Sequence, residues 1–436
     1  MSDWLAPYEP SADTPWNRRA AAHLLRRAGF CSGEDELREA LDAGPQATVA
    51  RLFDAEERSA RCRELDALGE ALAARGDVGA LRGWWLLRMR HTSRPLHARM
   101  TVFWHNHFAT SFDKVRDARM MAQQLGTLER HALGKFEPLL LAMAQDPAMI
   151  VWLDGQQNVK GRPNENFARE LFELFTLGVG NYTERDIREA ARGFTGWQQR
   201  GGRFHFARAE HDGGEKSVFG RSGPFGGEDV VRLTVAQPAC ATFVATKLLR
   251  EFVCPEPPDD LIDALAKRLV ENGCDVRDAL QTLLLSRAMF DRRWYRARIK
   301  SPVELVVGLA RSLNLQVPAQ RFESAVAQMG QRLLEPPSVK GWDGHRAWLN
   351  SATMLVRLNA AARAVDPELG FDPAALRTKL DLGTRERVIA FCGNLALDGD
   401  VPDVLRASLA GLNGELDDLL RSGLRLLLSS PEYQMA

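Results

Sequence analysis

Residues 164–178 read NENFARELFELFTLG, and the rest of the chain is interpreted from this stretch. Wound as an α-helix at about 100° per residue, it places Asn166, Glu170 and Glu173 on one stripe beside an apolar sector. Ionised carboxylates are costly to bury unless they are paired, hydrogen-bonded or bound to a metal. The stretch therefore predicts either a helix that forms a functional site or a helix whose acids pair with arginines along a solvated face.

Length and composition set the first limits. The chain has 436 residues, enough for one or two domains with a sizeable core. Lys plus Arg and Asp plus Glu both number 57, so no overall basic field favours nucleic acid or an anionic membrane as a partner. The six cysteines lie far apart without a CxxC pair, which predicts buried free thiols in a reducing compartment.

The N-terminal sequence bears on localisation. It reads MSDWLAPYEPSADTPWNRR, with an acid where a signal peptide carries basic residues, and no apolar segment follows it. No later run reaches the ~18 apolar residues of a membrane span. We therefore expect a soluble, cytoplasmic protein that does not enter a membrane.

Helical patterns fill almost the whole chain. Ser32 with Asp35, for example, resembles a capping box at a helix start. Strand signals are nearly absent, so we predict an all-α fold, a single large multi-helix domain over residues 1–436. A subdivision into a site-bearing half (1–234) and a helical support half (235–436) is an alternative.

Two long irregular stretches interrupt the helices. Residues 198–232 are rich in Gly, Arg and Phe, and residues 335–347 are rich in Pro, Gly and Trp. We expect mostly loop in the first, with a short hairpin as an alternative. Loops of this length inside a compact chain are uncommon and are often functional, so both stretches are predicted to carry functional side chains.

His105 and His107 form an HNH triplet on a predicted helix. Residues two apart on a helix point roughly 200° apart, so both can ligate one ion only if the helix ends or distorts there. His107 continues an apolar stripe through Met100 and Phe103, which predicts that it is buried. A hydrogen-bonded core histidine is the commoner meaning of that pattern, with a metal ligand as the alternative.

The loop HDGGEKSVFG supplies His211, Asp212 and Lys216. A His-Asp pair can ligate a metal or act as an acid/base with its orienting carboxylate, and the alternative is a plain turn. The sequence has no Walker A loop, GxSxG or HExxH, and GVGNYT stops short of the dinucleotide fingerprint. No nucleotide cofactor is expected.

Several blocks occur in order along nearly the whole chain. They are WNRRAAAHLLRRAGF, FWHNHFATSFDKV, DPAMIVWLD, NENFARELFELFTLGVGNYTERDIREAARGFTGW, HDGGEKSVFG and LLEPPSVKGWDGHRAWLNSATMLVR. Together they resemble the bacterial family defined by domain of unknown function 1800. The residues that stand in the family's blocks are His105, His107, Asn164, Glu165, Asn166, Arg169, Glu170, Glu173, Arg192, Trp197, His211, Asp212, Lys216, Gly341 and Trp342.

The resemblance has further implications. Many members are exported, often beside a protein resembling the sulfatase and phosphatase superfamily, so it implies such a partner, although this chain has no visible leader. The family's blocks gather His, Asp, Glu, Asn and Lys on one helix end, one helix and one loop, which can converge on one site. Imidazole and carboxylate ligands suit zinc, iron or manganese, and helical scaffolds with inward carboxylates hold such ions.

The first hypothesis is therefore a metal-dependent enzyme with a small-molecule or polymer substrate. Hydrolysis by metal-bound hydroxide is marginally preferred over oxygen activation. Asp212 is a ligand or base in this hypothesis. The predicted metal ligands are His105, His107, Glu170, Glu173 and His211.

Two alternatives remain open. One is a non-enzymatic binding or assembly module, in which these polar residues form a buried network that fixes the loops. The other is a metal-free acid/base enzyme that uses His211 and Asp212, with Lys216 and Arg192 gripping an anionic substrate. In all three, Glu165 and Arg169 are interpreted as a paired flank of the 164–178 helix.

Overall fold

The computed structural model describes residues 3–31 and 33–436, and within them the chain is mainly helical, which confirms the predicted all-α class. Up to residue 193 the elements are α1 (Arg18–Ala28), α2 (Glu34–Asp54), α3 (Ala60–Arg75), α4 (Val78–His91), α5 (Pro95–His107), α6 (Phe112–Val115), α7 (Ala118–His131), α8 (Phe136–Ala144), α9 (Pro147–Trp152), η1 (Gly155–Gln157), α10 (Asn166–Glu170), η2 (Leu171–Thr176) and α11 (Glu184–Gly193). Ser32 lies outside the described residues, and α2 begins behind Gly33, whose backbone N–H donates to the Glu36 carboxylate over 3.2 Å.

The second part of the chain begins with two short hairpins and then becomes helical again. Its elements are β1 (Trp197–Arg200), β2 (Arg203–Phe206), η3 (Arg208–Glu210), β3 (Lys216–Val218), β4 (Arg221–Gly223), α12 (Gly227–Val235), α13 (Pro238–Phe252), α14 (Asp259–Glu271), α15 (Val276–Leu284), η4 (Arg292–Trp294), α16 (Pro302–Ser312), α17 (Ala319–Gln328), η5 (His345–Trp348), α18 (Ser351–Arg363), η6 (Pro367–Leu369), α19 (Pro373–Leu380), α20 (Arg385–Leu397), α21 (Asp403–Ala410), α22 (Leu416–Leu428) and η7 (Glu432–Gln434).

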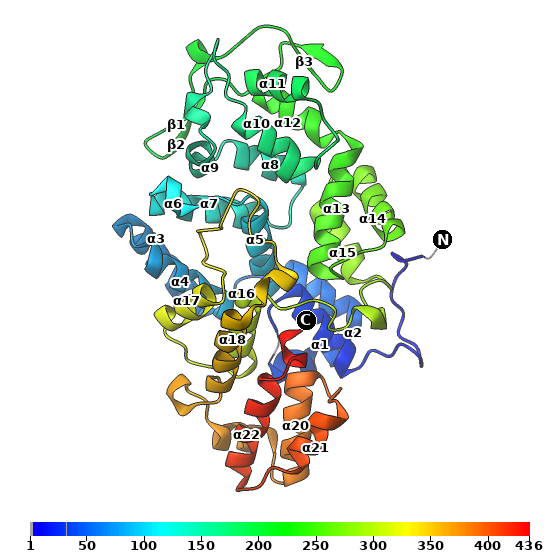
Figure 1. Ribbon diagram of the computed structural model, residues 1–436. Helices are drawn as coiled ribbons and strands as arrows, with labels where there is room; N and C mark the ends of the chain where they lie inside the picture. The colour runs from blue at the N-terminus through cyan, green and yellow to red at the C-terminus, as the bar shows by residue number, and fades with distance from the viewer. Residues whose placement is uncertain (1–2, 32) are drawn as a thin grey trace.

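The molecule is elongated (Figure 1). The hairpins with α10, α11 and α12 form one end, and α20, α21 and α22 form the other. One large hydrophobic core joins α5 to the helices of the hairpin end and to α13, α14 and α15. A second core joins α4 and α7 to the helices from α16 onward. The part of the chain before residue 290 contributes to both of these cores, and the subdivision near residue 234 stays a prediction.

The two stretches predicted to be irregular differ in their content of secondary structure. The region from Trp197 pairs β1 with β2 and β3 with β4, both antiparallel, so it holds more strand than the predicted loop with one hairpin. The stretch after α17 is irregular apart from η5, as predicted. In Figure 1 it is the yellow segment that crosses in front of α5.

Residues 164–178 do not form the single α-helix that their periodicity predicts. α10 ends at Glu170, and Leu171–Thr176 is a π-helix. The wider turn is closed by the backbone bond from Leu177 N–H to Phe172 O, over 2.8 Å, and by the Thr176 hydroxyl, which bonds Leu171 O. The stripe drawn at 100° per residue therefore ends at Glu170. π-turns are rare and often lie at functional sites.

Two further features concern the cysteines and the membrane. All six cysteines are free, and five of them are buried, which confirms the predicted thiols. Across residues 3–31 and 33–436, no helix combines the length and the apolar character that crossing a membrane requires.

Candidate functional site

Helix α5 is the element on which the predicted histidines stand. Pro95 occupies its first turn, where a missing N–H costs nothing, and an apolar stripe through Leu96 and Met100 fixes the helix in the core. The helix ends at His107, and the N–H of Phe108 closes the last turn on Trp104 O over 2.8 Å.

Each residue of the HNH triplet at the end of α5 forms a hydrogen bond with a backbone group of another segment. The Nε2 atom of His105, fully buried, accepts from the N–H of Leu334 over 3.1 Å. The Asn106 amide accepts from Trp342 N–H over 2.8 Å and donates to Trp342 O over 3.3 Å. Two neighbouring residues of α5 therefore fix two points of the 331–348 segment.

His107 points to a third segment. Its Nε2 atom lies 3.0 Å from Phe175 O in the π-helix, and its ring is 5% exposed among aromatic rings that include Phe243 of α13. Because a carbonyl only accepts, Nε2 carries the proton. Burial and the charge of Lys247 lower the pKa of His107 to about 3, so the ring is neutral at physiological pH. The predicted burial of His107 is confirmed.

The acids of the 164–178 stretch lie in two different settings. Arg169 bonds Glu165 over 3.0 Å and Glu184 over 2.8 Å, so the flank predicted to be paired is paired. Glu173 accepts from the Tyr182 hydroxyl over 3.1 Å. Burial, and then the neighbouring Glu173 charge, raise the pKa of half-buried Glu170. These contacts hold the helix in place and do not gather its carboxylates with a histidine.

The polar side chains of the HDGGEK loop form hydrogen bonds within the loop and with Arg192 and Thr195. The Arg192 Nε–H donates to Asp212 over 2.7 Å, and this bond is the main cause that lowers the Asp212 pKa to about 2. Lys216 is 1% exposed, and its Nζ donates to Asp212 O over 2.5 Å and to Gly214 O over 3.0 Å. His211 Nδ1 lies 2.9 Å from Thr195 O. The predicted catalytic residues thus fix the turn between η3 and β3.

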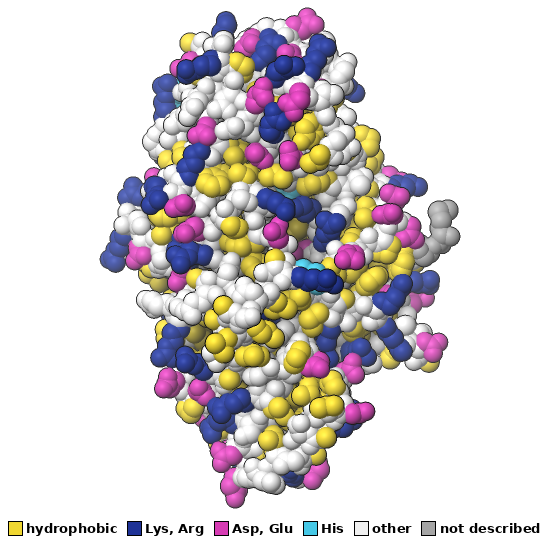
Figure 2. Space-filling view, in the orientation of Figure 1, with side chains coloured by type: hydrophobic (Ala, Val, Ile, Leu, Met, Phe, Trp, Pro, Cys, Tyr) yellow, Lys and Arg dark blue, Asp and Glu magenta, His cyan; other side chains and the backbone are white. Residues whose placement is uncertain are grey.

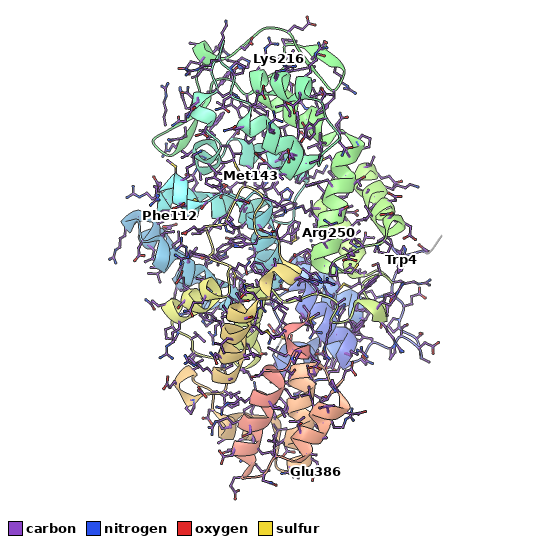
Figure 3. The ribbon with its side chains drawn as sticks, viewed as in Figure 1. Trp4, Phe112, Met143, Lys216, Arg250 and Glu386 are labelled. Carbon is purple, nitrogen blue, oxygen red and sulfur yellow. The ribbon has the colours of Figure 1, made fainter. Side chains whose placement is uncertain are left out.

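The predicted metal ligands do not converge. His105 contacts the 331–348 segment, His107 the π-helix, and His211 the hairpin end. Figure 3 shows how far the hairpin end lies from the middle of the molecule, with Lys216 near one tip and Arg250 on α13. In the part of the chain that the structure describes, no group of three or more His, Cys, Asp or Glu side chains is arranged to hold a metal ion. The five-residue site predicted from the sequence is therefore not preformed.

A cavity of about 420 Å³ lies instead between α5, the C-terminal half of α13, the residues around Arg298 and the start of α16, and the 331–348 segment. We call it the α5–α13 pocket. Figure 2 shows Lys and Arg side chains gathered on this face, where α13 and the 331–348 segment lie side by side in Figure 1. His107 and Asn106 line it, so the HNH triplet both shapes this pocket and holds one wall.

The floor of the α5–α13 pocket is a buried charge network. Glu304, at the start of α16, lies 2.7 Å from Arg99 Nη1 and 2.9 Å from Arg298 Nη1, and all three side chains are at least 92% buried. Arg99 also meets Glu251 of α13 over 2.5 Å. Although burial opposes the charge of Glu304, the two guanidinium groups outweigh it and hold its pKa well below the usual range. The floor is thus paired internally.

The wall contributed by α13 carries charges of a different kind. Across the described residues, neither the Lys247 ammonium nor the Arg250 guanidinium has a side-chain hydrogen bond or ion pair, although Lys247 Nζ lies 5.4 Å from the Phe243 ring centroid. Burial, and then the charges of Arg250 and Lys340, lower the pKa of Lys247. Two cations therefore face the cavity without a protein counter-ion.

The mouth of the α5–α13 pocket is formed by the 331–348 segment. Lys340 is paired with Asp343 over 2.6 Å, and both are largely exposed. The indoles of Trp342 and Trp348 are about 8% and 7% exposed, so they form an apolar side of the opening. Glu256 also lines the pocket, is exposed, and forms no side-chain hydrogen bond or ion pair within the described residues.

Among the residues of this pocket, the sequence points to His107, to Trp342 and to the irregular 335–347 stretch, but not to the α13 wall or the floor. A Lys and an Arg near the C-terminal end of an amphipathic helix are ordinary, since the helix dipole favours cations there. Arg99, Arg298 and Glu304 carry no local motif either. The KGWDGHRAW block, part of the stretch predicted to carry functional side chains, supplies several residues of the pocket lining.

Comparisons with known proteins identify a family and nothing more specific. The sequence profile described as "Protein of unknown function (DUF1800)" matches residues 23–435, so the chain belongs to this family, as its blocks indicated. No curated protein and no solved structure matches the chain.

Proposed function

We propose that this DUF1800 chain binds a small anionic ligand in the α5–α13 pocket, with Lys247 and Arg250 holding the charge of the ligand. The observation that carries the proposal is a pair of cations beside a cavity, neither of which has a counter-ion in the described part of the chain. Elsewhere in the same pocket, each arginine of the floor has its carboxylate. An unpaired cation that is partly desolvated is unfavourable in the free protein, and a bound anion relieves it.

The pocket limits the size and character of the ligand. A volume of about 420 Å³ lies within the range that encloses small metabolites. The cations stand on one wall, whereas Trp342 and Phe103 offer apolar surface. These features support a ligand with a carboxylate or phosphate at one end and a compact apolar or planar part at the other.

This proposal is closest to the metal-free alternative, moved to a different place in the molecule. The contacts of His105, His107 and Asp212 support the other alternative as well, since His105 and Asp212 fix loops and His107 fixes the π-helix. The finer hypothesis of a metal-dependent hydrolase has no support from the arrangement of its ligands, and a sulfatase-like partner stays a prediction.

The test is a thermal-shift and calorimetry series on the full chain. The probes are inorganic phosphate, pyruvate and benzoate, with glucose as a neutral control. We expect stabilisation by at least one anion, falling with ionic strength, and none by glucose. Lys247→Met should remove the response, whereas Lys267→Met on exposed α14 should keep it. The proposal fails if no anion stabilises the wild type, or if both variants respond like it.

A further inference from the structure

Three lysines of this chain are partly or fully buried, and they differ in what their amines contact. Lys216 Nζ donates to two backbone carbonyl oxygens, and Lys300 Nζ donates to Tyr433 O over 2.6 Å. These contacts use N–H donors of both amines and fix where the amines point. Lys247 has no such acceptor among the described residues. Its amine is therefore available to a molecule in the cavity.

The groups around Lys247 oppose its positive charge. Arg250 stands one helical turn further along α13, and Lys340 reaches in from the 331–348 segment. Of the carboxylates that line the pocket, Glu251 and Glu304 are engaged by arginines and Asp343 by Lys340, which leaves exposed Glu256. His107, also nearby, is neutral. A lysine that is partly desolvated and beside other cations is an activated amine nucleophile.

The spacing of Lys247 and Arg250 indicates what kind of molecule would use both. Residues i and i+3 of a helix stand on one face with their Cβ atoms about 5–6 Å apart. Arg250 presents a fork of donors that suits a carboxylate, while the Lys247 amine is a single point. A molecule whose carboxylate lies next to a carbonyl carbon can engage both at once. The 2-oxo acids are the smallest compounds of that class.

We propose that Lys247 is a catalytic amine that forms an imine with the carbonyl carbon of a 2-oxo acid, while Arg250 holds the adjacent carboxylate. This inference rests on the proposed anion site, since it names the class of ligand for that site. The bond formed is between Nζ and the carbonyl carbon. The carbonyl oxygen leaves as water.

The step is balanced without any further reactant. The neutral amine attacks the carbonyl carbon, and the electron pair of the C=O bond moves to oxygen, which takes the proton that nitrogen gives up. The nitrogen lone pair then expels the hydroxyl, protonated by solvent, as water. Nothing is oxidised or reduced. The product is an imine whose protonated form withdraws electrons from the neighbouring carbon.

Borohydride trapping on the full chain tests the inference. The protein is incubated with pyruvate, reduced with borohydride and mapped by peptide mass spectrometry. We expect the adduct at Lys247 to form at least about tenfold faster than at exposed lysines such as Lys267, since the pocket would hold the carbonyl carbon next to the amine. Lactate, which has the carboxylate but no carbonyl, should protect Lys247 in the wild-type protein.

Lys247→Arg separates this inference from the anion site. The variant keeps a cation but loses the primary amine, so it should still be stabilised by pyruvate while the adduct disappears. If pyruvate stabilises the wild type but the adduct is absent, or is spread evenly over the lysines, the imine inference is wrong and the anion site stands. If no anion stabilises the wild type and no adduct forms at Lys247, both are wrong. Lactate protection needs no variant and decides the matter if Lys247→Arg does not fold.

Discussion

The hairpin end and the α5–α13 pocket use the same residue types in opposite ways. At the hairpin end, Asp212 is bonded to Arg192, and the Lys216 ammonium is held by carbonyl oxygens. In the pocket, the buried floor is paired, but Lys247 and Arg250 on its wall have no ion pair among the residues that the structure describes. A charge whose partner lies within the chain stabilises the fold, whereas a charge facing a cavity without a partner is available for a ligand.

This difference shows what the strongest motif of the hairpin end does in the fold. The HDGGEK block is distinctive because a tight turn needs those residues to satisfy one another, and its chemistry is then already used. The residues of the pocket wall are undistinguished in the sequence. Lys247 and Arg250 stand out because neither forms a side-chain hydrogen bond or ion pair within residues 3–31 and 33–436.

The largest expected effect concerns the paired floor. Glu304→Gln removes the charge that Arg99 and Arg298 share, so two buried guanidinium groups lose their counter-ion. We expect a loss of about 3–5 kcal/mol in the free energy of unfolding, measured by urea denaturation. Glu271→Gln, at an exposed pair on α14, is the matched control. Equal losses in the two variants would contradict the contrast between paired floor and exposed surface.

Acid stability tests the histidines that hold the pocket walls. Burial lowers the pKa values of His105 and His107 to about 3, below the value near 6.5 of an unfolded chain. The unfolded state therefore binds more protons below that value, and stability falls as the pH drops towards 3. Between about pH 6 and pH 4, each histidine should contribute a loss of about 1.4 kcal/mol per pH unit.

The variant for this test is His107→Gln, whose amide can still donate to Phe175 O. Its unfolding free energy should fall less steeply with decreasing pH than that of the wild type, measured by urea denaturation at each pH. Parallel pH profiles for the two proteins would show that His107 is not held neutral by the fold.

Gly341→Ala tests how closely the 331–348 segment is fixed to α5. A Cβ at Gly341 would lie 2.3 Å from Asn106 Oδ1, whereas one at Gly330 would meet nothing within 4 Å. Both glycines have positive φ, at 84° and 95°, so both variants carry a similar conformational cost. We expect Gly341→Ala to cost about 1–3 kcal/mol more than Gly330→Ala, and to weaken the anion response as well. Similar unfolding midpoints for the two variants would mean that the 331–348 segment can move away from α5 at little cost.

The smallest effect is expected at the hairpin end. Asp212→Asn should cost about 1 kcal/mol at neutral pH, because the pair with Arg192 is partly exposed. The Asp212 pKa of about 2 lies below the unfolded value near 3.9, so its stabilisation is complete above about pH 4 and is lost as the pH falls through 2. The variant should lack that loss and keep the full anion response. A reduced anion response would contradict a purely structural role for this loop.

The sequence predicted those features that depend on residues close together in the chain. The helical class, the irregular 335–347 stretch and the Glu165–Arg169 pair all follow from periodicity and spacing, and all are present. The burial of His107 followed from its stripe. Its partner, Phe175 O, could not be predicted because it depends on a π-turn, which residue composition does not signal.

The α5–α13 pocket depends on contacts between distant parts of the chain. Arg99, Glu251 and Glu304 meet only after α5, α13 and α16 have packed. A periodicity argument places each of them on a helix face but does not say which faces meet. The absence of a partner for Lys247 is harder still to predict, since it requires knowledge of every neighbour.

The hydrogen bonds between α5 and the 331–348 segment have a consequence for hydrogen exchange. The amide protons of Leu334 and Trp342 lie outside η5, in the irregular part of the segment, and their acceptors are His105 Nε2 and Asn106 Oδ1. They can exchange with solvent only when the segment separates from the end of α5. Both amides should therefore exchange slowly and at one shared rate, so that this irregular cover opens as a unit instead of fraying.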